Sequence, residues 1–245
     1  MEIYTLTLLK FLLLFLSGFL IGVSKTGIPG LGLLAISLST IVLPAKAATG
    51  IILIVLICGD IFAVIYYKRN AVWKHLLRLF PFAFTGIFIG FLIMKKINDE
   101  QLRPVIGIII LVMLGLNYLW KKNNPDIPQR WYFAAVLGLI AGITTMMANA
   151  AGPIMVIYLL AMNLDKKEFV GTSAWYFFIG NLFKVPFSAK LGLINTHSLQ
   201  LNLFILPGVI LGAITGIFIL KKLSTKMFNT IVEILTIIAA IKLII

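Results

Sequence analysis

The sequence has few charged residues. Asp, Glu, Lys and Arg together make up 12% of its 245 residues, whereas hydrophobic residues make up 61%. A soluble domain carries about 25% charged residues, so a water-soluble fold of this composition would expose a large apolar area. A helix needs about 20 apolar residues to cross a bilayer, which leaves length for roughly eight to ten spans. We predict an all-α polytopic membrane protein with no room for a soluble catalytic domain.

Cysteine and catalytic motifs are also scarce. The single cysteine, Cys58, excludes an internal disulfide. The motifs H-E-x-x-H, G-x-S-x-G and the P-loop do not occur. His75 and His197 have no carboxylate or cysteine at the spacing of a metal site. We therefore expect no metal, no cofactor and no enzyme activity, and the absence of a P-loop argues against direct use of ATP.

Acidic residues are few compared with basic ones: 8 Asp and Glu stand against 21 Lys and Arg, a net charge of +13. The basic residues lie in short connections between apolar runs and not in a stripe with aromatic residues, so nucleic acid is not an expected partner. Lys and Arg are enriched in the cytoplasmic loops of membrane proteins. We therefore expect loops 68–75, 121–130, 163–168 and 221–226 in the cytoplasm and both termini outside.

Charged positions divide the chain into about ten apolar runs. Two of them, 28–44 and 153–164, are short for a full span, and we expect half-helices or re-entrant segments there. The first run has no basic residue before Lys10 and no clean cleavage site, so we expect it to belong to the mature protein. The runs are 6–24, 28–44, 47–67, 76–94, 104–120, 131–148, 153–164, 169–188, 198–220 and 227–245.

The second half of the chain repeats the first. The equivalent residues are 120 to 126 positions apart, and the offset grows in small steps along the chain, as loop insertions would cause. Five runs per half is an odd number, so the halves are expected to be inverted repeats with a site at their interface. We assign 1–122 to the first repeat, 123–130 to a connection and 131–245 to the second repeat. The matched pairs are Gly18 and Gly138, Gly22 and Gly142, Gly32 and Gly152, Pro81 and Pro207, Gly86 and Gly212, and Gly90 and Gly216.

Each half contains one interrupted apolar stretch. The first, Ser17–Leu34, reads S-G-F-L-I-G-V-S-K-T-G-I-P-G-L-G-L-L, and its counterpart ends in A-N-A-A-G-P at Pro153. Glycine and proline interrupt helices, and an interruption inside a membrane is tolerated only within protein or at a polar cavity. Half-helices that begin at Pro29 and Pro153 would present free N–H groups to an anion. The residues expected to bind it are Ser24, Lys25, Thr26, Gly27, Gly30, Thr145, Asn149 and Gly152.

Lys25, Asp60 and Lys184 are charged residues inside apolar runs. A charge at such a depth is costly and usually functional. Asp60 and Lys184 lie in the paired motifs G-D-I-F-A-V and G-N-L-F-K-V, where Asn181 takes the place of Asp60. We expect Lys25 and Lys184 to attract an anion and Asn181 to hydrogen-bond to it. Asp60 is expected to carry a proton and to pair with Lys184 or Lys25 across the repeat interface when no substrate is bound.

Each of these features has a structural alternative. The glycines would serve only close helix packing, and each charge would lie near a helix end, close to water.

In these motifs the chain resembles the sulfite exporter TauE/SafE family of membrane transporters. The resemblance covers nearly the full length and rests on the duplication, on S-K-T-G-I-P-G-L-G with its counterpart at 138–153, and on N-L-F-K-V-P-F-S-A-K-L-G-L-I. It implies transport of a small anion, such as sulfite, a sulfonate or a related organosulfur acid, across a bacterial-type inner membrane.

The sequence thus predicts a secondary transporter that works by alternating access, with broken or re-entrant helices at the repeat interface. Its expected partners are a small anionic substrate and membrane lipid, and a homodimer is left open. An anion channel of the same architecture, an intramembrane enzyme and a membrane subunit of a larger complex are the alternatives.

Overall fold

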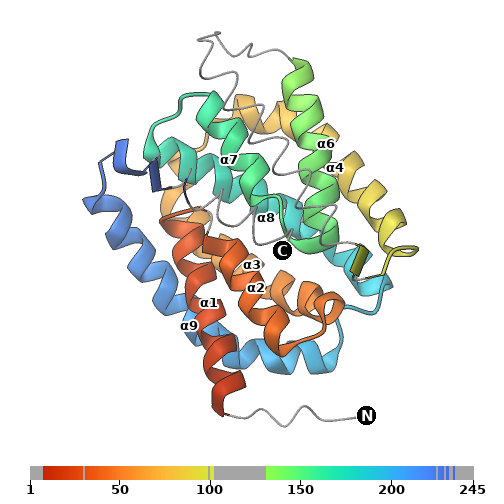
Figure 1. The fold of residues 1–245 in the computed structure, drawn as a ribbon. Helices are drawn as coiled ribbons and strands as arrows, with labels where there is room; N and C mark the ends of the chain where they lie inside the picture. The colour runs from red at the N-terminus through yellow and green to blue at the C-terminus, as the bar shows by residue number, and fades with distance from the viewer. Residues whose placement is uncertain are drawn as a thin grey trace.

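The computed structural model describes residues 8–29, 31–98, 100–101, 131–224, 226–228, 230–231 and 234. Gly30, the run 104–120, the connection 123–130 and most of the run 227–245 lie outside the described residues. Every regular element in the described part is helical (Figure 1). The elements are α1 Leu8–Thr26, α2 Leu31–Val42, α3 Ala45–Tyr67, the 3-10 turn η1 Lys68–Asn70, α4 Trp73–Met94, α6 Trp131–Ala148, α7 Gly152–Ala161, α8 Lys166–Lys190 and α9 Thr196–Lys222.

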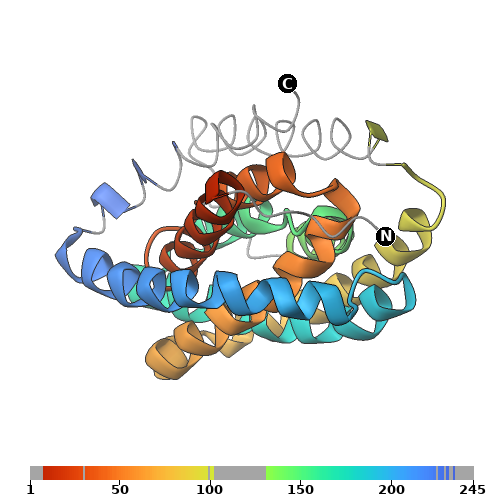
Figure 2. The same cartoon turned by 90° about the horizontal axis from the view of Figure 1, so that it is seen from below.

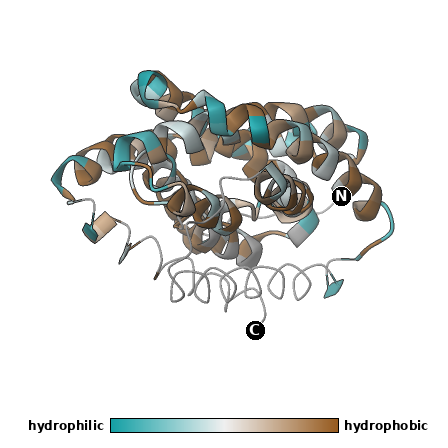
Figure 3. Cartoon of the chain, turned by 90° about the horizontal axis from the view of Figure 1, so that it is seen from above, coloured by the Kyte–Doolittle hydropathy of each residue, from teal (hydrophilic) through white to brown (hydrophobic). Residues whose placement is uncertain are grey.

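Five described helices are long and apolar enough to cross a membrane: α1, α3 with η1, α4, α6 and α9. α8 is equally long but less apolar. The predicted short segments are confirmed, because α2 has 12 residues and α7 has 10. Hydrophobic residues run along the helices and are not confined to the core (Figure 3). Large apolar side chains such as Leu77, Leu203 and Phe218 are exposed, as a lipid-facing surface requires.

Local sequence sets several of the helix starts. Asp165 accepts hydrogen bonds from the backbone N–H groups of Lys167 and Glu168, and the Glu168 side chain accepts one from the N–H of Asp165. This capping box fixes the start of α8. Asn195 and Ser198 form the same arrangement at the start of α9.

Two helix pairs, α1 with α9 and α4 with α6, approach so closely that glycine is required at their contacts. A Cβ atom at Gly22 of α1 would overlap the carbonyl oxygen of Val209 on α9. A Cβ atom at Gly142 of α6 would overlap the carbonyl oxygen of Ala83 on α4. Gly22 and Gly142 are 120 residues apart, and Ala83 and Val209 are 126 apart. The glycine and its contact residue in one helix pair therefore match those in the other pair at the offsets of 120 and 126 residues found in the sequence.

The helices α3 and α8, which carry the paired G-D-I-F-A-V and G-N-L-F-K-V motifs, pack antiparallel. Gly50, near the start of α3, lies against the carbonyl of Leu193, just beyond α8. Gly171, near the start of α8, lies against the carbonyl of Tyr67 at the end of α3. Figure 2 shows the long helix α9 running across one face of this arrangement.

Three of the four loops predicted to be cytoplasmic meet at one end of the helices. The Val72 backbone N–H donates to the Thr172 hydroxyl, and the Lys166 ammonium donates to the carbonyls of Leu220 and Leu223. The first bond joins segment 68–75 to the second turn of α8, and the others join segment 163–168 to the end of α9 and to segment 221–226. The fourth loop, 121–130, lies outside the described residues.

The glycine contacts predict matched losses of stability. We expect Gly22→Ala and Gly142→Ala each to destabilise the protein by about 1–3 kcal/mol, because an added methyl group would overpack the helix contact. Gly180→Ala is the control, since a Cβ there would meet no atom within 4 Å. Melting temperatures of the detergent-solubilised variants measure the effect, and equal values for all three would contradict the packing role.

Candidate functional site

The first interruption lies between α1 and α2. The α1 helix ends at Thr26, and the next helix begins at Leu31. The hydroxyl of Ser24 accepts a hydrogen bond from the backbone N–H of Gly32 at 3.1 Å, which ties the two helix ends together. The interruption predicted in Ser17–Leu34 is therefore confirmed.

The second interruption lies between α6 and α7. Asn149 has a φ of 54°, a left-handed conformation that asparagine adopts more readily than most residues. It ends α6, and α7 begins at Gly152 with Pro153 in its first turn, a position that proline favours. The predicted second interruption is thus confirmed as well.

The two interruptions meet at one cavity, which we call the central cavity. Its volume is about 50 Å³ on a measure in which one water fills about 10–15 Å³, so it has room for a few waters or one small ion. Its apolar lining includes Ile36, Leu56 and Phe177. Its polar lining consists of Ser24 and Lys25 from α1, Thr145 and Asn149 from the second interruption, and Ser173 and Asn181 from α8.

A buried ion pair lies at this cavity, which its Lys25 lines. The Lys25 ammonium lies 2.7 Å from Asp60 Oδ1 and 4.2 Å from the centre of the Phe177 ring. The Asp60 carboxylate is fully buried, and the Lys25 side chain is 10% exposed. Asp60 does not reach water at a helix end, so the structural alternative is wrong for Asp60. Lys25 lies in the last turn of α1, and its ammonium contacts the Asp60 carboxylate.

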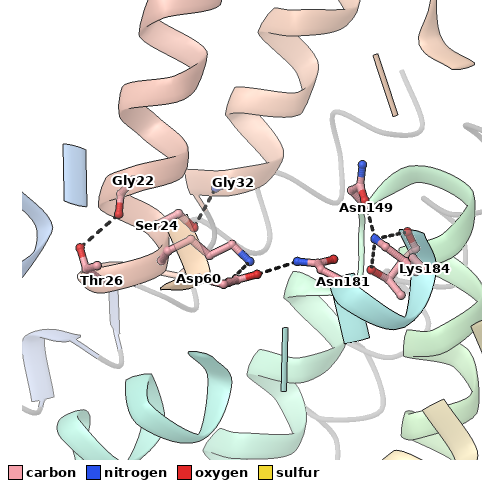
Figure 4. A network of polar contacts seen from close by, with 10 residues as sticks. Gly22, Ser24, Thr26, Gly32, Asp60, Asn149, Asn181 and Lys184 are labelled. Carbon is pink, nitrogen blue, oxygen red and sulfur yellow. Dashed lines mark hydrogen bonds and ion pairs between the residues drawn. The ribbon is translucent and has the colours of Figure 1, made fainter. Parts of the chain in front are cut away.

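Of the two partners predicted for Asp60, the structure shows Lys25 and not Lys184. Lys25 and Asp60 both belong to the first half of the sequence, so this ion pair does not cross between the halves as expected. The contact across the halves is a hydrogen bond of 2.7 Å from Asn181 Nδ2 to Asp60 Oδ2 (Figure 4). These are the equivalent positions of the two paired motifs, 121 residues apart, so the two motifs touch at their matching residues.

Lys184 lies behind the second interruption. Its side chain is 1% exposed, so the alternative location near water is wrong here too. The ammonium donates to the Thr145 carbonyl at 3.0 Å, to the Thr145 hydroxyl at 3.1 Å and to Asn149 Oδ1 at 2.6 Å. These contacts engage its three N–H donors. Lys184 thereby orients two residues that line the central cavity (Figure 4).

Thr26 and Gly27 point away from the central cavity. The Thr26 hydroxyl donates to the carbonyls of Gly22 and Ala213. A Cβ at Gly27 would meet the Gly216 carbonyl at 2.6 Å. Both residues therefore fasten the end of α1 to α9. Gly152 lines the central cavity, whereas Gly30 lies outside the described residues.

Sequence reasoning missed Ser173 and Phe177, which line the cavity from α8. A signal for them was present. Ser173, Phe177, Asn181 and Lys184 are spaced by four, four and three residues, which places them on one helix face. Counting back from Asn181 at helical spacing would have found them.

The ion pair predicts a specific pattern of stability. We expect Asp60→Leu alone to destabilise the protein by about 3–5 kcal/mol, because it leaves the Lys25 charge buried without its partner. Lys25→Met combined with Asp60→Leu should recover most of this loss, since apolar side chains replace a buried pair at little cost. Melting temperatures in detergent measure both. A double variant no more stable than Asp60→Leu would show that Lys25 and Asp60 are not energetically coupled.

A comparison with known proteins identifies the family of this chain. Residues 14–243 match the family model described as Sulfite exporter TauE/SafE. No curated protein and no solved structure gave a significant match. The match covers almost the whole chain, including both interruptions and the ion pair between them. With several apolar helices long enough to cross a membrane, the chain is a membrane protein that belongs to the sulfite exporter TauE/SafE family.

Proposed function

We propose that the protein is a secondary transporter that moves a small anion across the cytoplasmic membrane, bound in the central cavity. The anion is sulfite, a sulfonate or a related organosulfur acid, in line with the family's description. The observation that carries this proposal is the meeting of both interruptions at one small cavity beside the Lys25–Asp60 pair.

The charges near the cavity favour an anion. When Lys184 is protonated, it and Lys25 contribute two positive charges against the one negative charge of Asp60, and the network then carries net positive charge. The start of α7 adds to this, because Gly152 lines the cavity and a helix N-terminus attracts negative charge. The small volume suits an ion of sulfite size more closely than a large organic acid.

The repeated contacts support an arrangement of two inverted repeats, 1–122 and 131–245, joined by 123–130. The glycine contacts of α1 with α9 and of α6 with α4 match at the sequence offsets. Equivalent helices α3 and α8 run antiparallel and touch at Asp60 and Asn181. In transporters of this plan, one part rocks against the other around a site at the repeat interface. We infer alternating access on this basis.

Asp60 is positioned to couple the anion to a proton. A bound anion beside Lys25 would compete with the Asp60 carboxylate for the same ammonium group. When the anion takes over this contact, Asp60 loses its counter-charge in a buried site, and protonation removes the resulting penalty. The exchange would couple the occupancy of the cavity to proton uptake.

The proposed roles of Lys25 and Lys184 predict how their substitution affects sulfite binding. Sulfite should raise the melting temperature of the purified wild-type protein, and Lys25→Met and Lys184→Met should lose this rise because each removes positive charge at the cavity. Lys190→Met is the matched control, since Lys190 is exposed at the end of the same helix as Lys184. Size-exclusion profiles show whether each variant is folded. Folded Lys25→Met and Lys184→Met variants that keep the full shift would remove both lysines from the site.

The proposed role of the Asp60 carboxylate predicts how sulfite uptake depends on pH. Sulfite uptake into proteoliposomes should respond to an imposed pH gradient in the wild type, and Asp60→Asn should abolish the response while it keeps the hydrogen-bonding shape. Counterflow of labelled sulfite, which needs no gradient, should persist in the variant and distinguishes a transporter from a channel. An unchanged pH profile in Asp60→Asn would assign Asp60 a structural role only.

A further inference from the structure

A second, larger cavity lies at the end of the structure where the three basic loops meet. Its volume is about 540 Å³, roughly ten times that of the central cavity on the same measure. We call it the lysine vestibule. It is lined by Tyr66 and Tyr67 at the end of α3, Asn70 of η1, Lys166 and Lys167 at the start of α8, and Leu220 and Lys221 at the end of α9.

The vestibule is positively charged. Three of its seven described lining residues are lysines, and none is acidic. The nearby carboxylates of Asp165 and Glu168 are engaged by the backbone N–H groups of the capping box. Among the described residues no ion pair holds any of the three lysines. Lys166 donates to the carbonyls at the end of α9, and Lys221 lies 5.6 Å from the Tyr66 ring.

The vestibule and the central cavity lie close to each other in the structure. Tyr67 lines the vestibule, and its hydroxyl donates to the Thr26 carbonyl at 3.0 Å, next in the chain to Lys25 of the central cavity. On α8, Lys167 lines the vestibule and Val170 lines the central cavity. These two residues are less than one helical turn apart, about 4.5 Å along the axis.

The opposite end of the structure has a smaller cavity in its described residues, with a volume of about 150 Å³ and a lining that includes Ala47, Leu193 and Asn195. At the repeat offsets, Tyr66, Asn70 and Leu220 correspond to Phe187, Leu191 and Met94. Those three side chains pack into a single apolar cluster with Phe91 and Met146. Among the described residues, the vestibule end therefore has the larger and more basic of the two cavities.

From these observations we propose that the lysine vestibule is a second anion site, which binds a small oxyanion on its way to or from the central cavity. The inference rests on the proposed function, since the same anion occupies both cavities in turn. A cavity with low-dielectric walls and charges of one sign concentrates counter-ions and raises their association rate.

Sulfite titration of the purified protein by calorimetry, in zwitterionic detergent, separates the two sites. The variant Lys167→Gln/Lys221→Gln should lose a weak, salt-sensitive class of site and keep the central one. Lys25→Met should show the reverse pattern. Lys95→Gln/Lys96→Gln, at the opposite end, is the matched control and should bind as the wild type does.

Uptake into phosphatidylcholine liposomes tests the route. At an ionic strength of about 0.01 M, where charges act over about 30 Å, the vestibule variant should raise the KM for sulfite about 3- to 10-fold with Vmax unchanged. At about 1 M the Debye length is about 3 Å, and the difference from the wild type should disappear.

Three other outcomes would contradict either the vestibule site or the proposed function. An unchanged KM and an unchanged weak site in the vestibule variant would overturn the vestibule and leave the proposed function intact. If Lys25→Met binds sulfite in the central cavity as the wild type does, the proposed function is overturned instead. If the vestibule variant differs from the wild type only in liposomes that contain phosphatidylglycerol, the pocket binds a lipid headgroup, and the proposed route is wrong.

Discussion

The contact between Lys25 and Asp60 is the constraint on which the rest of the site depends. A single charge at this depth would be far too costly to keep, and the pair is tolerated because each charge is the other's counter-ion at 2.7 Å. The pair also needs a third group, because the second carboxylate oxygen requires a donor, which Asn181 supplies. Two helices of one half and one helix of the other must therefore meet at one point. That meeting places the cavity where both interruptions converge.

Close helix packing makes this meeting possible. The glycine contacts of α1 with α9 and of α4 with α6 bring backbones together without intervening side chains. The first pair contains α1, which ends at the first interruption, and the second pair contains α6, which ends at the second. The Thr26 hydroxyl also donates a hydrogen bond to the Ala213 carbonyl on α9. The polar residues at the cavity are thus fixed by an apolar scaffold.

Local signals in the sequence were enough to predict the interruptions, the short helices and the positions of the charges inside apolar runs. Glycine and proline mark the interruptions wherever they fall, and a charge in an apolar run is visible without a structure. The partner of Asp60 was less accessible, because the choice between Lys25 and Lys184 depends on how α1, α3 and α8 cross. The direction of Thr26 and Gly27 was hidden for a similar reason. The last turn of a helix has several faces, and only the position of α9 decides which face is covered.

The bond between Asp60 and Asn181 carries a consequence for how such a chain can arise. If a single ancestral half once assembled as a symmetric dimer, the same side chain would have stood at both positions. Two carboxylates 2.7 Å apart could not both be ionised, and two amides would have left Lys25 without a counter-ion. Only after the two copies were joined in one gene could each mutate alone, one to the acid and one to its amide. The acid and its amide thus provide one negative charge for Lys25 and one hydrogen bond, which two identical carboxylates could provide only by sharing a proton.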